Sequence, residues 1–262
     1  MNLLEMAIYT KTPQQIELMR QAGRIVGQAL QLVKEQVRPG VTTHELDEVA
    51  YNFIKKQGAI PTFKGYHPFP SIPAFPGTLC TSVNEQIVHG IPGGRVLEEG
   101  DIISIDCGAI YRGWHGDSAM TVPVGRVGPD IEKLLETGRE SLMLGIAQAR
   151  AGNRIGDISS TIEKRIKQGD PGYGIVREYG GHGIGKSLWE EPSVPNYGPA
   201  GRGVKLTEGM VIAIEPMINM GTHETETMPD FWTVVTRDRK PSCHFEHTVA
   251  VTSNGPDILT LP

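Results

Sequence analysis

The feature that most constrains the fold of this chain is an order of segments that occurs twice. Residues 97–106 read LEEGDIISID, and residues 206–215 read LTEGMVIAIE. Each segment has the pattern of an apolar strand that ends on an acid, Asp106 in the first and Glu215 in the second. Internal similarity of this kind indicates that one structural unit is built twice. We therefore expect two related halves whose acids occupy equivalent places.

Three more pairs of segments follow the same order along the chain. They are VRPGVTTHELDEVAYNFIKKQG (37–58) with ARAGNRIGDISSTIEKRIKQG (149–169), HGI (89–91) with HGI (182–184), and HGDSAMTV (115–122) with HFEHTVAV (244–251). From these pairs we predict an N-terminal extension over residues 1–11 and one domain over residues 12–262. Within that domain the pseudo-repeats cover about 12–128 and 129–255.

Local signals indicate where the helices begin. Thr12 and Thr42 each stand three residues before a Gln or a Glu, which is the pattern of a capping box. Apolar residues at helical spacing follow both caps. A third helical stretch begins near Pro129 and runs to about residue 149. Strand-like runs lie between these helical segments, so both kinds of element are expected in each half.

The composition bounds the class of protein. The chain has 262 residues, of which 39% are hydrophobic, and 25 Lys and Arg stand against 30 Asp and Glu, for a net charge of −5. No basic run suggests a nucleic acid or an anionic membrane as partner. Three widely spaced cysteines suggest free thiols in a reducing compartment. With no signal peptide and no apolar run of about 20 residues, we expect a cytoplasmic protein.

The stretch from Asp101 to Asp117 reads as a strand, a turn and a second strand. Alternation along the first strand puts Asp106 on the face opposite to Ile105 and Cys107. A hairpin can return Asp117 to the side of Asp106. Two buried carboxylates repel each other unless they share a proton or a cation. We therefore interpret this pair as half of a metal site.

A pseudo-twofold axis between the halves would bring the acids of both halves together at the boundary between them. The expected members of the cluster are Asp106, Asp117, Glu215, Glu246, His182 and, at its edge, His89. Structural zinc sites favour Cys and His, so four acids with one ligating histidine do not fit that class. The set suits a hydrolytic site in which two metal ions about 3.5–4 Å apart hold one water.

A competing interpretation comes from residues 180–187, GGHGIGKS, which satisfy the pattern of a phosphate-binding loop. Such a loop needs a long helix directly after it, and Pro192 and Pro195 oppose that helix. We therefore expect the glycines to let the backbone pack closely around His182. Cys107 is not expected to act as a nucleophile, because it points away from Asp106.

The motifs DCGAIYRGWHGD, GHGIG, IEP, FEHT and VNEQIVHGIP together closely resemble those of the type I methionine aminopeptidases. The resemblance covers the chain from Thr12 to about Leu261. It implies an α+β pita-bread fold, in which two pseudo-symmetric halves form a curved antiparallel sheet with helices on its outer face. This implied fold agrees with the internal repeat.

The resemblance also implies roles for the acids and histidines. Two divalent metal ions, which in this family are cobalt, manganese, iron or zinc, would be held by Asp106, Asp117, His182, Glu215 and Glu246. Asp117 and Glu246 would bridge the ions. A metal-bridged hydroxide would attack the carbonyl of the first peptide bond, with Glu215 taking its proton. His89 would lie near the scissile nitrogen, so Glu215 and His89 are the expected catalytic residues.

A substrate pocket is implied as well. The residues that would bind substrate are Tyr66, Phe69, Cys80, His89, Trp189 and Trp232. Two features depart from the family pattern: Trp189 stands where the family has a histidine that touches the substrate carbonyl, and residues 71–76 look like an insertion beside the pocket. From the residues alone, the aromatic side chains of Tyr66, Phe69 and Phe75, together with Trp232, fit ordinary core packing, and the functional alternative is an apolar substrate pocket.

The sequence thus predicts a metalloexopeptidase that removes the initiator methionine from nascent proteins when the second residue is small. Its partners would be nascent chains and, beyond them, the ribosome, with no direct nucleic-acid or membrane contact, and we expect a monomer. Two alternatives remain. One is a metal-free binding protein on the same fold, which should have lost ligands. The other is an X-Pro aminopeptidase or prolidase, which usually adds an N-terminal domain.

Overall fold

The structure is a computed structural model that describes residues 8–68 and 70–262. Four helices lie in the described chain: α1 (Pro13–Gln36), α2 (Thr43–Lys56), α3 (Pro129–Ala147) and α4 (Ile155–Gly169). The strands are β1 (Ile60–Pro61), β2 (Leu79–Val83), β3 (Gln86–Val88), β4 (Ile102–Tyr111), β5 (Trp114–Pro123), β6 (Gly174–Ile175), β7 (Gly181–Gly183), β8 (Glu190–Val194), β9 (Val211–Ile214), β10 (Met217–Asn219), β11 (Thr225–Thr227), β12 (Val234–Thr236), β13 (Ser242–His244), β14 (His247–Thr252) and β15 (Gly255–Ile258).

The helices begin where their caps predict. Thr12 Oγ1 accepts a hydrogen bond from the backbone N–H of Gln15, and Gln15 Oε1 accepts one from the N–H of Thr12, at 3.3 and 2.9 Å. Thr42 and Glu45 form the same reciprocal pair at the start of α2. Each box satisfies backbone donors that the first helical turn leaves without partners. The third predicted helix begins at Pro129 as expected.

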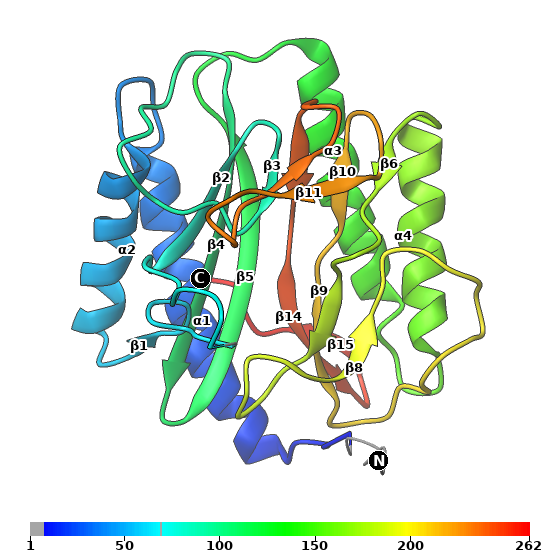
Figure 1. Cartoon of the computed structure of the whole chain (residues 1–262). Coiled ribbons are helices and arrows are strands. Elements are labelled where there is room, and N and C mark those ends of the chain that lie inside the picture. The colour runs from blue at the N-terminus through cyan, green and yellow to red at the C-terminus, as the bar shows by residue number, and fades with distance from the viewer. Residues whose placement is uncertain (1–7, 69) are drawn as a thin grey trace.

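The helices cover the strands in two pairs. Figure 1 shows α1 and α2 beside β4 on one side of the molecule, and α3 and α4 beyond β9 and β14 on the other. One buried cluster joins Leu30 and Ala50 to Ile103 and Ile105 of β4. A second joins α3 and α4 to Ile212 and Ile214. Each pair of helices therefore has its own core against its own strands.

All the strand pairings between the named strands are antiparallel. In one sheet β4 pairs with β1, β2 and β5, and in another the order is β15-β14-β9-β7-β8. These two sheets meet where Ala119 of β5 and Glu246 exchange backbone hydrogen bonds, at 2.8 and 3.4 Å. Beside this bond, Thr248 Oγ1 accepts from the N–H of Asp117 and donates to its carbonyl oxygen. We call this contact the seam.

No helix within residues 8–68 and 70–262 combines the length and the apolar character that crossing a membrane requires.

The packing of α1 on β5 leads to a test of stability. A Cβ atom added at Gly116 of β5 would lie 2.7 Å from the backbone nitrogen of Gly23 in α1. Overpacking of this kind costs about 1–3 kcal/mol. We expect Gly116→Ala to lower the urea midpoint of unfolding accordingly. Gly94→Ala is the control, because an added Cβ meets no atom within 4 Å there, and an equal loss in both variants would contradict the tight helix–strand contact.

Candidate metal centre

The β4–β5 hairpin returns one acid to the side of the other. Asp117 lies opposite Gly108, and Asp106 lies opposite Ala119, in the register of this pair. Since side chains alternate with a period of two, Asp106 and Asp117 project from the same face and are diagonal neighbours. On the other face, Cys107 is buried in the core with α1 and α2, which agrees with its predicted direction.

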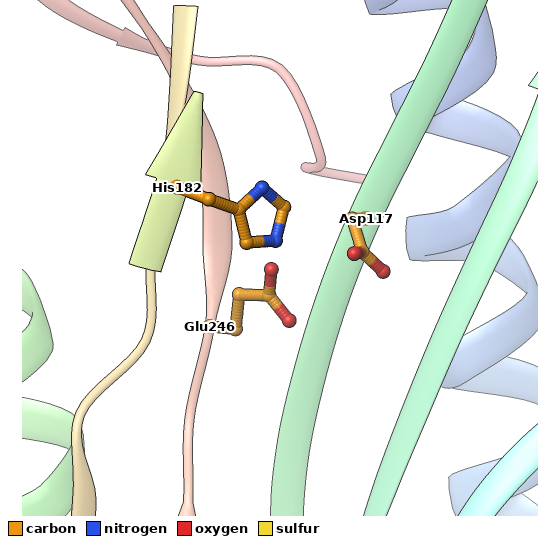
Figure 2. Close-up of side chains that lie close together, drawn as sticks. All are labelled: Asp117, His182 and Glu246. Carbon is orange, nitrogen blue, oxygen red and sulfur yellow. The ribbon is translucent and has the colours of Figure 1, made fainter. Parts of the chain in front are cut away.

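The second half supplies three further side chains from separate segments. Glu215 directly follows β9, Glu246 lies between β13 and β14, and His182 is the central residue of β7. Figure 2 shows the side chains of His182, Glu246 and Asp117 close together, each from a different segment of the chain. One ligand atom of each lies within 4.8 Å of the others. The seam produces this convergence because it joins the strand of Asp117 to the backbone of Glu246.

The carboxylates are buried without enough hydrogen-bond donors of their own. Asp117, Glu215 and Glu246 expose 4%, 8% and 2% of their surfaces. Among the described residues, Oδ1 of Asp106, Oδ1 of Asp117 and Oε1 of Glu246 are buried and find no hydrogen-bond partner. Buried polar atoms are rarely left in that condition. Oxygen atoms that converge in this way fit divalent cations, which would neutralise and bind them.

The electrostatics of the acids agree with this fit. Burial raises the pKa of Asp106 to about 7, and the nearby Glu215 carboxyl adds to the effect. Burial and neighbouring carboxyls also raise the pKa values of Asp117 and Glu246 well above their usual range. Raised pKa values mean that, without a cation, these acids retain protons to higher pH than exposed carboxyls do. A metal ion that binds here must therefore displace protons.

Glu215 differs from the other acids. Burial would raise its pKa, but the neighbouring imidazole of His244, followed by the charge of His182, outweighs burial and lowers it. The His182 Nε2 atom lies 3.6 Å from Glu215 Oε1. His182 Nδ1 lies 2.8 Å from the carbonyl oxygen of Gly183. Because a carbonyl only accepts, Nδ1 carries the proton, and Nε2 is free to bind a metal ion.

A cavity of about 60 Å³, called the small cavity below, lies beside the acids. Besides the five ligand candidates, it is lined by Phe63, Tyr66, Phe75, Cys80, His89, Leu188, Trp189 and Trp232. A second hollow of about 320 Å³ adjoins it, and His89, His182 and Trp189 belong to both. Of the six residues expected to bind substrate, five line the small cavity, and Phe69 lies outside the described residues.

The sequence interpretation missed three residues of the site. Phe63 and Leu188 line the small cavity, and no local pattern separates them from ordinary core residues. His244 lies in the larger hollow, with its Nε2 atom 3.4 Å from Glu215 Oε2. It stands two residues before Glu246, so strand alternation could have indicated a shared face.

His89 occupies an unusual backbone position at the edge of the cavity. Its φ of +60° is rare for a residue other than glycine. Its ring packs edge-on against Tyr179 and Trp232, with centroid distances of 5.7 and 6.4 Å. Burial lowers the pKa of His89 to about 4. The imidazole is therefore neutral at physiological pH.

The competing phosphate-loop interpretation is wrong in the described structure. Residues 181–183 form β7, the chain then bends through residues 185–189, and β8 follows from Glu190. No helix follows in this described segment, as the two prolines predict. Lys186 instead lies over the ring of Trp114, 5.6 Å from its centroid.

Buried acids and a histidine at the end of an apolar cavity define a metal-dependent hydrolase site. The sequence matches the metallopeptidase family M24 over residues 17–253, and the chain belongs to that family. The expected resemblance is confirmed at this level, and with it a site for divalent metal.

Relatives extend over almost the whole chain. Methionine aminopeptidase 1 of Bacillus subtilis is 51% identical and covers 97% of this chain and 99% of its own. A crystal structure of methionine aminopeptidase from Thermotoga maritima has a TM-score of 0.93 at 40% identity, covering 98% of this chain and all of its own. Prolidase from Pyrococcus furiosus, at 24% identity, shares the fold with a TM-score of 0.74 over 97% of this chain and 65% of its own. The predicted α+β pita-bread fold is confirmed.

The raised pKa of Asp106 predicts how stability depends on pH. An unfolded aspartate titrates near 3.9, so between about pH 4 and 7 the folded protein holds a proton that the unfolded chain releases. Stability of the chelator-treated protein should therefore fall as pH rises through this window. Manganese ions should restore it more strongly at pH 7.5 than at pH 5.5. At 100 times the Kd the gain is about 2.7 kcal/mol, or roughly 5–10 °C in Tm.

The measurement is differential scanning fluorimetry with and without manganese at both pH values. Asp117→Asn combined with Glu246→Gln should lose the metal-dependent gain. Glu136→Gln, at an exposed acid of α3, is the matched control and should keep it. An equal gain at both pH values would rule out proton displacement from these acids.

Proposed function

We propose that this protein is a metal-dependent aminopeptidase that removes the N-terminal methionine of new polypeptides whose second residue is small. The observation that carries the proposal is the small cavity of about 60 Å³, in which aromatic and apolar side chains lie beside the acids. Such a cavity suits one side chain held next to the metal site. Identity of 51% to a methionine aminopeptidase over nearly the full length supports the same activity.

The five ligand candidates divide between two ions in this proposal. Asp106 would hold one ion, His182 and Glu215 would hold the other, and Asp117 and Glu246 would serve both. The oxygen-rich set suits manganese, iron or cobalt as well as zinc. The carboxyl oxygens of Asp106, Asp117 and Glu246 that lack hydrogen-bond partners support the binding of cations at these acids.

When bound, the ions lower the pKa of water and polarise the first peptide carbonyl. The side chains do the rest. Glu215, whose pKa is lowered, is ionised and can accept a proton. His89 is neutral above about pH 4, so it acts near the scissile nitrogen through hydrogen bonding and not as a cation.

The walls of the cavity select the substrate side chain in this proposal. The indole N–H of Trp232 donates to the carbonyl oxygen of Pro73 at 2.9 Å, and Phe75 packs edge-on against the same ring at 5.3 Å. The segment expected to be an insertion thus supports the wall. With Tyr66 and Cys80 these surfaces suit an unbranched thioether, which adapts to irregular apolar space.

The wider setting follows from the substrate. The partners are the N-termini of nascent chains, met at the ribosome, and the protein works as a cytoplasmic monomer. Residues 12–262 act as one catalytic domain after the extension of residues 1–11. The matching order of two helices followed by strands supports the two pseudo-repeats, 12–128 and 129–255.

The test uses three peptides and the manganese-loaded protein, with release of free amino acid as the readout. Met-Ala-Ser should release methionine, and Met-Lys-Ser should react at least tenfold more slowly. The rate of methionine release from Met-Pro-Ser, compared with that from Met-Ala-Ser, measures any preference for proline in the second position, as expected of an X-Pro aminopeptidase or prolidase. Asp106→Asn should lose activity, whereas Glu136→Gln should retain it. No release from any peptide by protein with two bound ions would overturn the proposal.

Trp189 generates a separate prediction. Its ring packs edge-on against Tyr66 at 4.9 Å and faces His182 at 6.3 Å, with 47% of the residue exposed. An indole N–H can donate one hydrogen bond but cannot titrate. Trp189→His should raise kcat by about tenfold or more while leaving the metal content unchanged. Trp189→Phe is the control and should stay slow, and a loss of bound metal in Trp189→His would contradict this placement.

A further inference from the structure

One buried polar atom at the site is not explained by the five ligand candidates. The Nε2 atom of His244 has no hydrogen-bond partner among the described residues, although only 2% of the residue is exposed. The carboxyl oxygens in the same condition have a role as metal ligands, and His244 has none in the proposed division. A buried imidazole nitrogen that lacks a partner costs free energy, so a function for it is expected.

A carboxylate oxygen of Glu215 lies beside this nitrogen and points to its function. His244 Nε2 lies 3.4 Å from Glu215 Oε2, and His182 Nε2 lies 3.6 Å from Glu215 Oε1. The carboxylate is therefore flanked by one imidazole at each oxygen. The Oε1 side faces the proposed ligand His182, which leaves Oε2 for His244.

The backbone holds His244 firmly in this place. Its N–H donates to Thr121 Oγ1 at 2.9 Å, and Thr121 Oγ1 donates to its carbonyl oxygen at 2.8 Å. Thr121 belongs to β5, in the first half of the chain. On the other side His244 pairs with Met217 of β10, two residues after Glu215. The backbone of His244 is thus held between the two halves, which keeps its imidazole beside Glu215.

We propose that His244 is a positioning residue whose Nε2–H donates to Glu215 Oε2 and so aims Oε1 at the ion shared with His182. This inference rests on the metal site of the proposed function. Partners of this kind orient a ligating carboxylate and are worth about 10–100-fold in metal affinity. His244 does not touch the substrate or the ion in this arrangement.

The test is calorimetric titration of the whole, metal-depleted protein with manganese. His244→Leu should weaken binding of one ion by about 10–100-fold and leave the other unchanged. His244→Gln should stay within about threefold of the original, because an amide N–H can donate the same bond and is not a metal ligand. In cobalt-loaded protein, the d–d absorption should change in His244→Leu and be retained in His244→Gln.

His247 offers a matched control on the neighbouring strand. It is half-buried, and its Nδ1 atom lies 2.8 Å from Thr260 Oγ1, a residue outside the metal site. His247→Leu should leave manganese affinity unchanged even where it lowers Tm. If His244→Leu does not fold, His244→Asn replaces it, because the shorter amide does not reach Glu215.

The outcomes separate this inference from the proposed function. Unchanged affinity in folded His244→Leu or His244→Asn overturns the positioning role, and so does a His244→Gln variant as weak as His244→Leu. Metal binding that follows the prediction, without methionine release by the unmodified protein, overturns the proposed function alone. Unmodified protein that binds no divalent ion overturns both.

Discussion

The structure depends on the burial of several carboxylates that repel one another. Asp106, Asp117 and Glu246 all have raised pKa values because burial disfavours their charged forms and each lies near other acids. Such a cluster is tolerable only with protons or with cations. The same oxygens lack hydrogen-bond partners in the described structure. The acids therefore trade folding stability for metal affinity, which is the usual compromise at a functional site.

Rigid elements keep these acids at fixed positions. The β4–β5 hairpin sets the separation of Asp106 and Asp117 by its register. The seam between Ala119 and Glu246 then holds the acids of one half beside those of the other. Because each half packs its own helices on its own strands, the acids lie in or directly beside strands that these two cores support. His244 extends the same design, since Thr121 from the opposite half fixes its backbone.

The substrate side of the site is built with less regular structure. Trp189 lies in the bend between β7 and β8, next to Glu190, which pairs with the buried Lys11 at 2.8 Å. This ion pair ties the start of the described chain to the segment that carries the indole. Trp189 lines both the small cavity and the larger hollow. Trp189 is therefore in a position shared by the two pockets.

The sequence by itself determined the helix starts, the hairpin and the set of acids, because caps, strand alternation and the internal repeat are local or periodic signals. It also indicated five described residues of the cavity through their resemblance to known motifs. Only the tertiary structure brought Phe63, Leu188 and His244 to the site. Their positions depend on how strands far apart in the chain pair across the seam. Packing between the two halves decides that register. No single segment of the sequence carries a signal for this packing.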